Sequence, residues 1–190
     1  MPSNLESAPE APAATAATSS FSPDEAQQYF SELKGFEFSD SKATSFRAVT
    51  RIEILGKPTE ADRETIKQVM QELLDLGAKG IEIVESGGNV QLHFAETTEF
   101  GNIVPSVVKG SIGFFSRKGE ADEGTILIAA DRIISQRDRS HLIREEATQL
   151  ITGLGKDSDR YNDSLFQQRH DPVTQYSEID KAVIRMAFEQ

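Results

Sequence analysis

The order of hydrophobic periodicities along residues 46–190 constrains the fold of this chain more than any other sequence feature. Apolar residues alternate in some segments, which indicates strands, and recur every three to four residues in others, which indicates helices. The resulting order is a strand, a helix, four strands, a long helix, an irregular segment and a last helix. A twisted mixed five-stranded sheet packed by helices is the simplest α+β or α/β solution, and we expect the α+β class.

The bounds of the expected elements follow from these periods and from the turn and capping residues between them. Strands are predicted over 46–55, 80–85, 90–95, 111–117 and 125–130, and helices over 22–34, 59–77, 138–154 and from 177 onward. The first helix is short and begins at Ser22, a cap followed by proline in the first turn. Thr59 and Ser177 are each followed three residues later by aspartate, a form of the capping box.

Residues 1–20 differ in composition from the rest of the chain. They are mostly Ala, Pro, Ser, Thr and Glu, with Leu5 the one large apolar residue after Met1. Such a segment buries too little surface to offset its ordering entropy, so we predict a disordered tail or linker, followed by a single domain over 21–190. Its composition resembles the spacer of bacterial envelope lipoproteins and exported proteins. We therefore expect a secreted, periplasmic or envelope-anchored protein whose signal sequence was removed; the alternative is a cytoplasmic protein with a leader.

Charge and cysteine content exclude several classes of function. The chain has 20 Lys+Arg and 31 Asp+Glu, a formal charge of −11, which argues against a nucleic-acid-binding protein. It has no Cys, which excludes a Cys-ligated zinc site, an iron–sulfur cluster and a Cys nucleophile. Three His leave little material for a His-rich metal site. No segment reaches the roughly 18 apolar residues of a transmembrane helix.

The segment 138–154 carries the most informative pattern. Its apolar residues form one buried stripe, made of Ile143, Ala147, Leu150, Ile151 and Leu154. Glu145, Glu146 and Gln149 fall on the flank beside this stripe, with Glu146 nearest the core. Helical patterning alone predicts a polar flank that hydrogen-bonds to strand ends and loops.

The sequence Glu145-Glu146-Ala147-Thr148-Gln149 resembles the His-Glu-x-x-His helix of the zincin metallopeptidases, with both histidines replaced. The element order over 46–190 also resembles that superfamily, particularly its metzincin and matrixin-like branch. A closer resemblance is to a family of exported bacterial proteins of unknown function with a Glu-Glu-x-x-Gln helix. The residues that match it are Glu145, Glu146, Gln149, Gly153-Leu154, Lys156-Asp157-Ser158, Ser164-Leu165-Phe166 and Asp180 to Arg185. These resemblances imply a zincin-like fold.

The zincin motif can be matched to this chain one residue at a time. In an active zincin, two neutral imidazoles one turn apart bind Zn²⁺, and the Glu between them is the general base. Glu146 occupies the base position, whereas Glu145 and Gln149 occupy the ligand positions. The third metzincin ligand would stand at Gly155, which has no side chain, and the methionine turn is missing. The resemblance therefore implies a degenerate site without its zinc ligands, in which Glu146 is the one candidate catalytic residue.

Further candidates surround this flank. His141 precedes Glu145 by one turn and is a candidate cleft residue, as are Ser158 and Ser164 of the irregular segment. His170 is a candidate third group from the same segment. His93 is expected to be structural, on the polar face of its strand.

Two charged clusters complete the candidates. Asp157, Asp159 and Asp163 are spaced like calcium ligands, but the segment lacks the glycine turn and terminal glutamate of an EF-hand, so a turn built by the side chains is favoured. Arg132, Arg137, Arg139 and Arg144 form a basic group. Salt bridges to nearby acids are the favoured role, and contact with an anion or partner is the alternative.

The sequence thus predicts an exported protein of zincin-like fold, of unknown function, that is not a peptidase. It would bind an unknown ligand, peptide or protein partner in the former active-site cleft. One alternative is a divergent hydrolase that uses Glu146 as general base, either a metallopeptidase with unusual ligands or a carboxylate enzyme that works without a metal. Zinc and calcium are the alternative cofactors. A second alternative is a structural or interaction module. No cofactor is expected, and membrane association would come through a removed lipoprotein signal.

Overall fold

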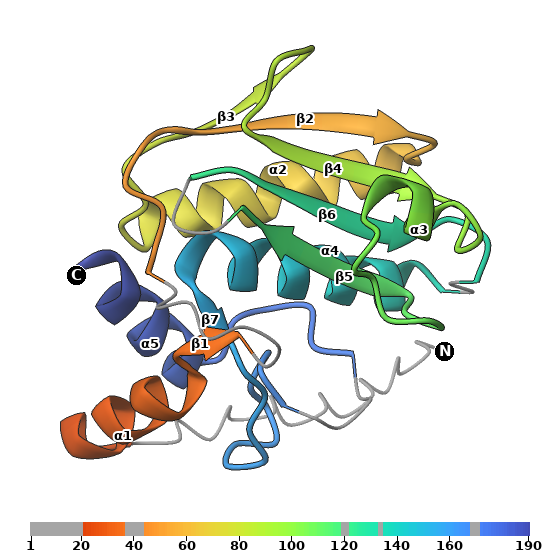
Figure 1. Cartoon of the computed structure of the whole chain (residues 1–190). Helices are drawn as coiled ribbons and strands as arrows, with labels where there is room; N and C mark the ends of the chain where they lie inside the picture. The colour runs from red at the N-terminus through yellow and green to blue at the C-terminus, as the bar shows by residue number, and fades with distance from the viewer. Residues whose placement is uncertain (1–20, 37–43, 119–121, 133–134, 168–171) are drawn as a thin grey trace, which may run out of the picture.

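The computed structural model describes residues 21–36, 44–118, 122–132, 135–167 and 172–190. Its strands are β1 Gly35–Phe36, β2 Thr50–Gly56, β3 Ile81–Val84, β4 Val90–Ala95, β5 Gly113–Arg117, β6 Gly124–Ala129 and β7 Leu154–Gly155. Its helices are α1 Pro23–Leu33, α2 Glu60–Asp75, α3 Phe100–Ile103, α4 Gln136–Thr152 and α5 Glu178–Phe188 (Figure 1).

The main sheet is mixed and has the strand order β3-β2-β4-β6-β5. The first four strands in this order are parallel, and β5 pairs with β6 in the antiparallel direction at one edge. The expected five-stranded mixed sheet of an α+β fold is therefore confirmed. All five strands lie within a few residues of their predicted bounds, because their alternating or continuous Val, Ile and Leu content is typical of strands.

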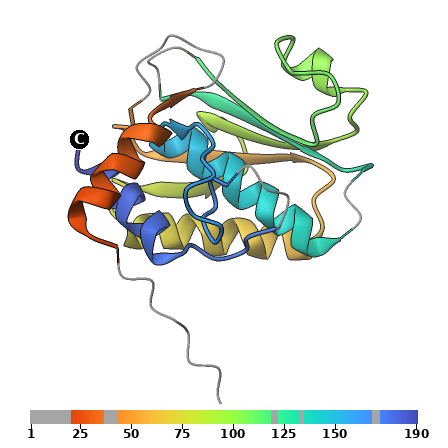
Figure 2. The same ribbon diagram turned by 90° about the horizontal axis from the view of Figure 1, so that it is seen from below.

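The two faces of the sheet carry different layers. Leu92 and Phe94 of β4 belong to the main hydrophobic core on one face, which α2 and α4 cover. On the other face, Leu127 of β6 packs with Phe100 of α3 in a smaller cluster. Figure 2 shows α2 and α4 on one side of the sheet and α3 on the other. Alternation along the strands thus gives α4 and α3 separate faces.

A second, two-stranded parallel sheet joins the N-terminal helix to the end of α4. Gly35 of β1 pairs with Leu154 of β7, and Phe36 pairs with Gly155. Helix α1 packs against α5 beside this small sheet (Figure 1). Both short strands and α3 were not predicted from the sequence, because elements of two and four residues are too short to show a hydrophobic period.

The ends of the helices follow their capping residues. Ser22, Thr59 and Ser177 each form a capping box. The box was predicted at Thr59 and Ser177, whereas a simple cap was predicted at Ser22. Helix α4 begins after Ser135, whose hydroxyl accepts the N–H of Asp138. Its predicted end near Gly155 was wrong: the helix stops at Thr152 because Gly153 adopts the left-handed conformation with φ 74°.

The predicted tail over residues 1–20 lies outside the described residues, and its disorder and the export that it suggested stay predictions. Across the parts of the chain that the structure describes, no helix combines the length and the apolar composition needed to cross a membrane.

A buried polar cluster connects α1, α5 and the segment that precedes α5. Asp180 is fully buried, and its carboxylate accepts hydrogen bonds from the Ser164 hydroxyl at 2.6 Å and from the backbone N–H groups of Leu165 and Ser177 at 3.0 Å. Because the carboxylate only accepts, Ser164 donates to it, and the Tyr29 hydroxyl therefore donates to Ser164 at 2.7 Å. One acid thus caps α5 and holds the irregular segment against α1.

This cluster predicts a large effect of Asp180→Ala on stability. Truncation leaves the Ser164 hydroxyl and two backbone N–H groups without their acceptor, so we expect the free energy of unfolding to fall by about 2–4 kcal/mol in urea denaturation. Glu178→Ala in the same helix is the matched control, because Glu178 pairs only with Lys181 at the surface and should change stability little. Equal effects of the two substitutions would contradict this account of Asp180.

Candidate binding site on helix α4

The polar flank of α4 lies where this helix packs against β5 and β6. Glu146 and Gln149 are buried, with 7% and 6% of their surface exposed, and the Glu145 side chain is 17% exposed. The structure therefore brings these three predicted site residues together on one side of the helix. Their role in binding or catalysis stays a prediction.

Glu146 lies against the first residue of the edge strand. A Cβ atom on Gly113 would stand 2.5 Å from Oε1 of Glu146 and 2.9 Å from Cδ2 of Leu142. The strand approaches the helix this closely because residue 113 has no side chain. Within the described residues, no group forms a hydrogen bond with the carboxyl group of Glu146. The fully buried side-chain atoms without a hydrogen-bond partner in those parts of the chain are Nε2 of His93 and Nε of Arg144, so the Glu146 carboxyl group is largely buried but keeps contact with solvent.

Burial and neighbouring acids change the protonation of this flank. Burial, followed by the charges of Glu145 and Asp157, raises the pKa of Glu146 well above its usual range. Burial and Asp157 raise the pKa of Glu145 to about 8. Both carboxyl groups therefore keep their protons to a higher pH than an exposed glutamate does.

His141 stands one turn before Glu145 and connects α4 to the segment before α5. Its Nδ1 atom lies 3.1 Å from the backbone nitrogen of Val173 and 3.0 Å from the carbonyl oxygen of the same residue. Its Nε2 atom lies 3.4 Å from Oε2 of Glu145. Burial lowers the pKa of His141, so the imidazole is neutral. In the tautomer with the proton on Nε2, Nδ1 accepts the Val173 N–H and the Nε2–H points at Glu145.

The basic residues of α4 serve a different flank of the helix. Arg139 forms a buried ion pair with Asp62 of α2, with Nε 2.9 Å from Oδ1. Arg144 is buried, pairs with Glu72 of α2 and stacks over the ring of Tyr176 at 4.5 Å. The favoured prediction of salt bridges is therefore confirmed for these two arginines.

For Arg137 and Arg132, in contrast, the structure gives no salt bridge to an acid among the described residues. Arg137 donates from Nε to the carbonyl oxygen of Pro172 at 3.2 Å, so it contacts the segment before α5 and not an acid. For Arg132 the predicted salt bridge stays a prediction, as does the alternative of anion or partner contact.

The remaining predicted site residues lie apart from the α4 flank. The Ser158 hydroxyl donates to Glu32 of α1 at 3.4 Å, and Ser164 belongs to the Asp180 cluster. Gly155, at the third-ligand position, lies in β7. His170 lies outside the described residues. The structure thus places Ser158 and Ser164 near α1 and α5, and only His141 joins the glutamates.

A metal site needs several ligand side chains that converge on one point. Among the described residues, no group of three His, Asp or Glu side chains is placed to hold a metal ion. The zinc and calcium alternatives therefore gain no support from those residues, including Asp157, Asp159 and Asp163.

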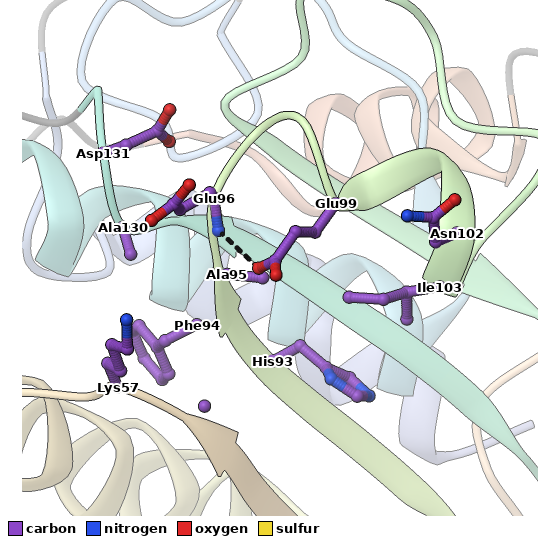
Figure 3. Close-up of a pocket in the computed structure, with 11 residues that line it drawn as sticks. Lys57, His93, Phe94, Ala95, Glu96, Glu99, Asn102, Ile103, Ala130 and Asp131 are labelled. Atoms are coloured by element: carbon purple, nitrogen blue, oxygen red, sulfur yellow. Dashed lines mark hydrogen bonds between the residues drawn. The ribbon is translucent and has the colours of Figure 1, made fainter.

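A separate pocket of about 490 Å³ opens on the other face of the sheet, at the carboxyl ends of β2, β4 and β6. Figure 3 shows the ring of His93 below Ile103 of α3, with Glu96, Glu99 and Lys57 around the opening. Its rim is exposed, and the Nε2 atom of His93 is buried with no hydrogen-bond partner among the described residues.

His93 lies on the strand face opposite the main core, as its alternation with Leu92 and Phe94 predicted. The pocket beside it was not predicted from the sequence. The order of strands and helices along the chain could have indicated the pocket, because clefts form at the edge of a sheet where the carboxyl ends of parallel strands meet. Recognising that edge required knowing which strands are parallel neighbours. The sequence of β2, β4 and β6 does not specify their order.

Comparisons with known proteins agree with this fold. Residues 25–190 match the family described as "Protein of unknown function (DUF2927)". No curated protein matches the chain. Two solved structures that match are described as "Structure of myroilysin" and "Crystal structure of myroilysin". Both have a TM-score of 0.51 and 14% sequence identity; the first covers 77% of this chain and 96% of its own, and the second 85% and 93%.

The likeness to myroilysin, at this identity, concerns the fold alone. It confirms the zincin-like fold that the sequence resemblance implied. The correspondence of Glu145, Glu146 and Gln149 to the metal-binding motif of the zincins stays a prediction from the sequence.

The raised pKa values predict that Glu146→Gln stabilises the protein at alkaline pH. A carboxyl group whose folded pKa exceeds its unfolded pKa favours folding while it is protonated, and this contribution disappears as pH rises through the folded pKa. Gln keeps the neutral shape, so we expect its advantage over the wild type to be absent near pH 4 and largest above pH 8. An advantage of about 1 kcal/mol corresponds to a Tm difference of about 2–4 °C.

Thermal unfolding followed at several pH values checks this expectation. Glu82→Gln, in exposed β3 at the opposite edge of the sheet, makes the same charge change and is the matched control. A Tm difference between Glu146→Gln and wild type that does not change with pH would contradict the buried, proton-binding state of Glu146.

Proposed function

The chain belongs to the DUF2927 family of unknown function, and from this premise we propose that it is a binding protein. Its ligand would bind at the polar flank of α4, formed by Glu145, Glu146 and Gln149. In this proposal the zincin-like fold is retained as a scaffold, and zinc-dependent peptide hydrolysis is absent.

The single observation that carries the proposal is the Glu146 side chain, which is largely buried and forms no hydrogen bond with the described residues. Burying a polar group without a partner costs about 1–3 kcal/mol. A ligand that supplies the missing partner would recover this free energy, and sites that sacrifice stability are typically functional.

The residues at the former ligand positions support binding over zinc catalysis. Zinc peptidases need imidazole ligands, whereas Glu145 and Gln149 stand at these positions and the third position is Gly155. A general base must also be deprotonated, and the raised pKa of Glu146 disfavours its deprotonated form. A bound metal ion would reverse this effect by favouring the carboxylate.

The same pair of acids favours one alternative function, a hydrolase that works without a metal. Two neighbouring carboxyl groups with different pKa values can divide the roles of general acid and base. Glu145, with a pKa of about 8, and the more strongly perturbed Glu146 meet this requirement. The alternative needs both residues and predicts that either substitution abolishes turnover.

Metal content and peptidase activity test the proposal directly. We expect the chain, purified without chelators, to contain no stoichiometric zinc by mass spectrometry and to cleave neither casein nor a panel of fluorogenic peptides. Glu146→Gln should behave like wild type in both assays. One zinc per chain, together with cleavage that Glu146→Gln abolishes and Glu82→Gln leaves intact, would overturn the proposal.

Binding at the α4 flank is tested by NMR titration with a pool of short random-sequence peptides. We expect shifts of amide resonances from α4 around Glu145 and from the start of β5, and their loss in Glu146→Gln. Shifts confined to the pocket at the ends of β2, β4 and β6 would assign binding to the other face and contradict the proposed site.

A further inference from the structure

We propose that the pocket at the carboxyl ends of β2, β4 and β6 binds a free amino acid with a polar, uncharged side chain. The ammonium and carboxylate groups of this ligand would contact Glu96 and Lys57 at the rim, and its side chain would reach His93 at the floor. The pocket lies on the face of the sheet opposite α4, so this inference does not rest on the proposed function of the α4 flank.

The course of the chain places this pocket where the direction of the strand connections reverses. From β2 the chain continues into α2, and from β6 into α4, and both helices cover the main-core face of the sheet. From β4, which lies between these two strands, the chain continues into α3 on the other face (Figure 2). Neighbouring parallel strands whose connections leave on opposite faces open a crevice at their carboxyl ends, and open sheets bind ligands there.

Hydrogen bonds around the pocket hold the strand ends and the loop after β4 in place. Gly56, with φ 82°, ends β2 so close to β4 that a Cβ atom there would stand 2.0 Å from the carbonyl oxygen of Phe94. Lys57 donates its backbone N–H to the same carbonyl oxygen at 3.1 Å. At the end of β6, the carboxylate of Asp131 accepts the backbone N–H of Thr97 at 2.9 Å and its hydroxyl at 3.0 Å. The pocket is thus formed without a ligand, and its volume of about 490 Å³ is typical of small-molecule sites.

The rim of the pocket carries charges of both signs that do not pair with each other. Its charged residues are Lys57, Glu96, Glu99 and Asp131. Asp131 holds Thr97, and Glu99 accepts the backbone N–H of Glu96 at 3.3 Å. The ammonium group of Lys57 and the carboxylate of Glu96, in contrast, form no hydrogen bond or ion pair with any described residue. Figure 3 shows these two side chains on the same side of the opening.

A ligand with both charges suits this rim better than a ligand with one. An anion at Lys57 would also face three acids, and a cation at Glu96 would also face the ammonium group of Lys57. In a free amino acid the ammonium and carboxylate groups are adjacent, so each can meet its counterpart on the same side of the opening. An internal peptide segment has lost both charges, which is why a free amino acid is the ligand proposed.

His93 is the second, independent argument, because it lines the pocket with an unused polar atom. Its cross-strand neighbours are Leu55 of β2 and Leu127 of β6, and Ile103 of α3 lies above its ring (Figure 3). Among these apolar side chains, Nε2 is buried and has no hydrogen-bond partner among the described residues. Burial also lowers the pKa of His93, so the neutral imidazole is favoured, with one nitrogen that donates and one that accepts.

The unused nitrogen of His93 selects the side chain of the ligand. A hydroxyl or amide group both donates and accepts hydrogen bonds, so it fits either tautomer of the imidazole. Asn102, on the same side of the opening as Ile103, offers a side-chain amide that forms no hydrogen bond with any described residue. Serine, asparagine and glutamine carry such groups, whereas an apolar side chain leaves His93 without a partner.

NMR titration of the full chain tests this inference. The probes are L-serine, L-asparagine and L-glutamine, with L-norleucine as the apolar comparison. We expect at least one of the first three to shift the amide resonances of His93, Glu96 and Asn102 at millimolar concentration. The N-acetyl and the carboxamide derivative of that amino acid each lack one charge and should bind at least about tenfold more weakly. Norleucine should bind at least about fivefold more weakly.

Variants at the rim test the two charges separately. Lys57→Met and Glu96→Gln should each weaken binding about tenfold or more, and because both residues are exposed the chain should stay folded. Lys79→Met, before the amino end of β3, and Glu82→Gln are the matched controls and should leave binding unchanged. Glu146→Gln should also leave it unchanged, which keeps this test independent of the α4 flank.

His93→Leu separates a binding role of this residue from a structural one. Leucine removes the unpartnered nitrogen and matches the apolar neighbours on β2 and β6, so we expect the Tm to stay equal or to rise. Affinity for the polar amino acid should fall about fivefold or more. A lower Tm with unchanged affinity would show that His93 is structural and would overturn its role in binding.

The remaining outcomes are distinguishable. A derivative without one charge that binds as tightly as the free amino acid would overturn the need for both charges. Norleucine binding as tightly as the polar amino acids would overturn the polar side chain. The absence of shifts with serine, asparagine and glutamine at millimolar concentration would overturn the whole inference and leave the proposed function of the α4 flank standing. Stoichiometric zinc with peptidase activity would overturn that proposed function and leave this pocket unaffected.

Discussion

The enclosure of α4 on several sides is the constraint on which the rest of the structure depends. The sheet covers one side of the helix, and α2, α5 and the small β1–β7 sheet cover others. Eleven of its residues are buried, and five of these are polar or charged residues other than Glu146, so these groups must find partners inside the protein. Arg139 and Arg144 have acids of α2, whereas the carboxyl group of Glu146 has no such partner among the described residues.

This contrast explains why one helix carries both structural and candidate functional acids and bases. The arginine flank joins α4 to α2 through ion pairs that are costly to break once buried. The glutamate flank faces the edge strand, where Gly113 allows backbone to approach the acid closely. Glu145 and Glu146 are neighbours on this flank, and burial together with nearby acids raises the pKa of both carboxyl groups.

The sequence predicted the sheet, the long helices and the grouping of Glu145, Glu146 and Gln149, because periodicity and helical spacing are local properties. It did not predict that Ser164 would join Asp180 and Tyr29, since that contact connects segments 16 and 135 residues apart. The pairing of Arg139 with Asp62 and the pocket beside His93 likewise depend on strand order and helix docking. Short elements such as β1 and α3 were missed because they form through tertiary contacts.

The protonation of the acidic flank connects stability with binding. A neutral Glu145–Glu146 pair avoids the cost of two buried charges, so the ligand-free fold is favoured when both groups hold their protons. Any ligand of this flank therefore meets acids whose protonation depends on pH, so its affinity should change as the pH passes through the pKa of Glu145, about 8.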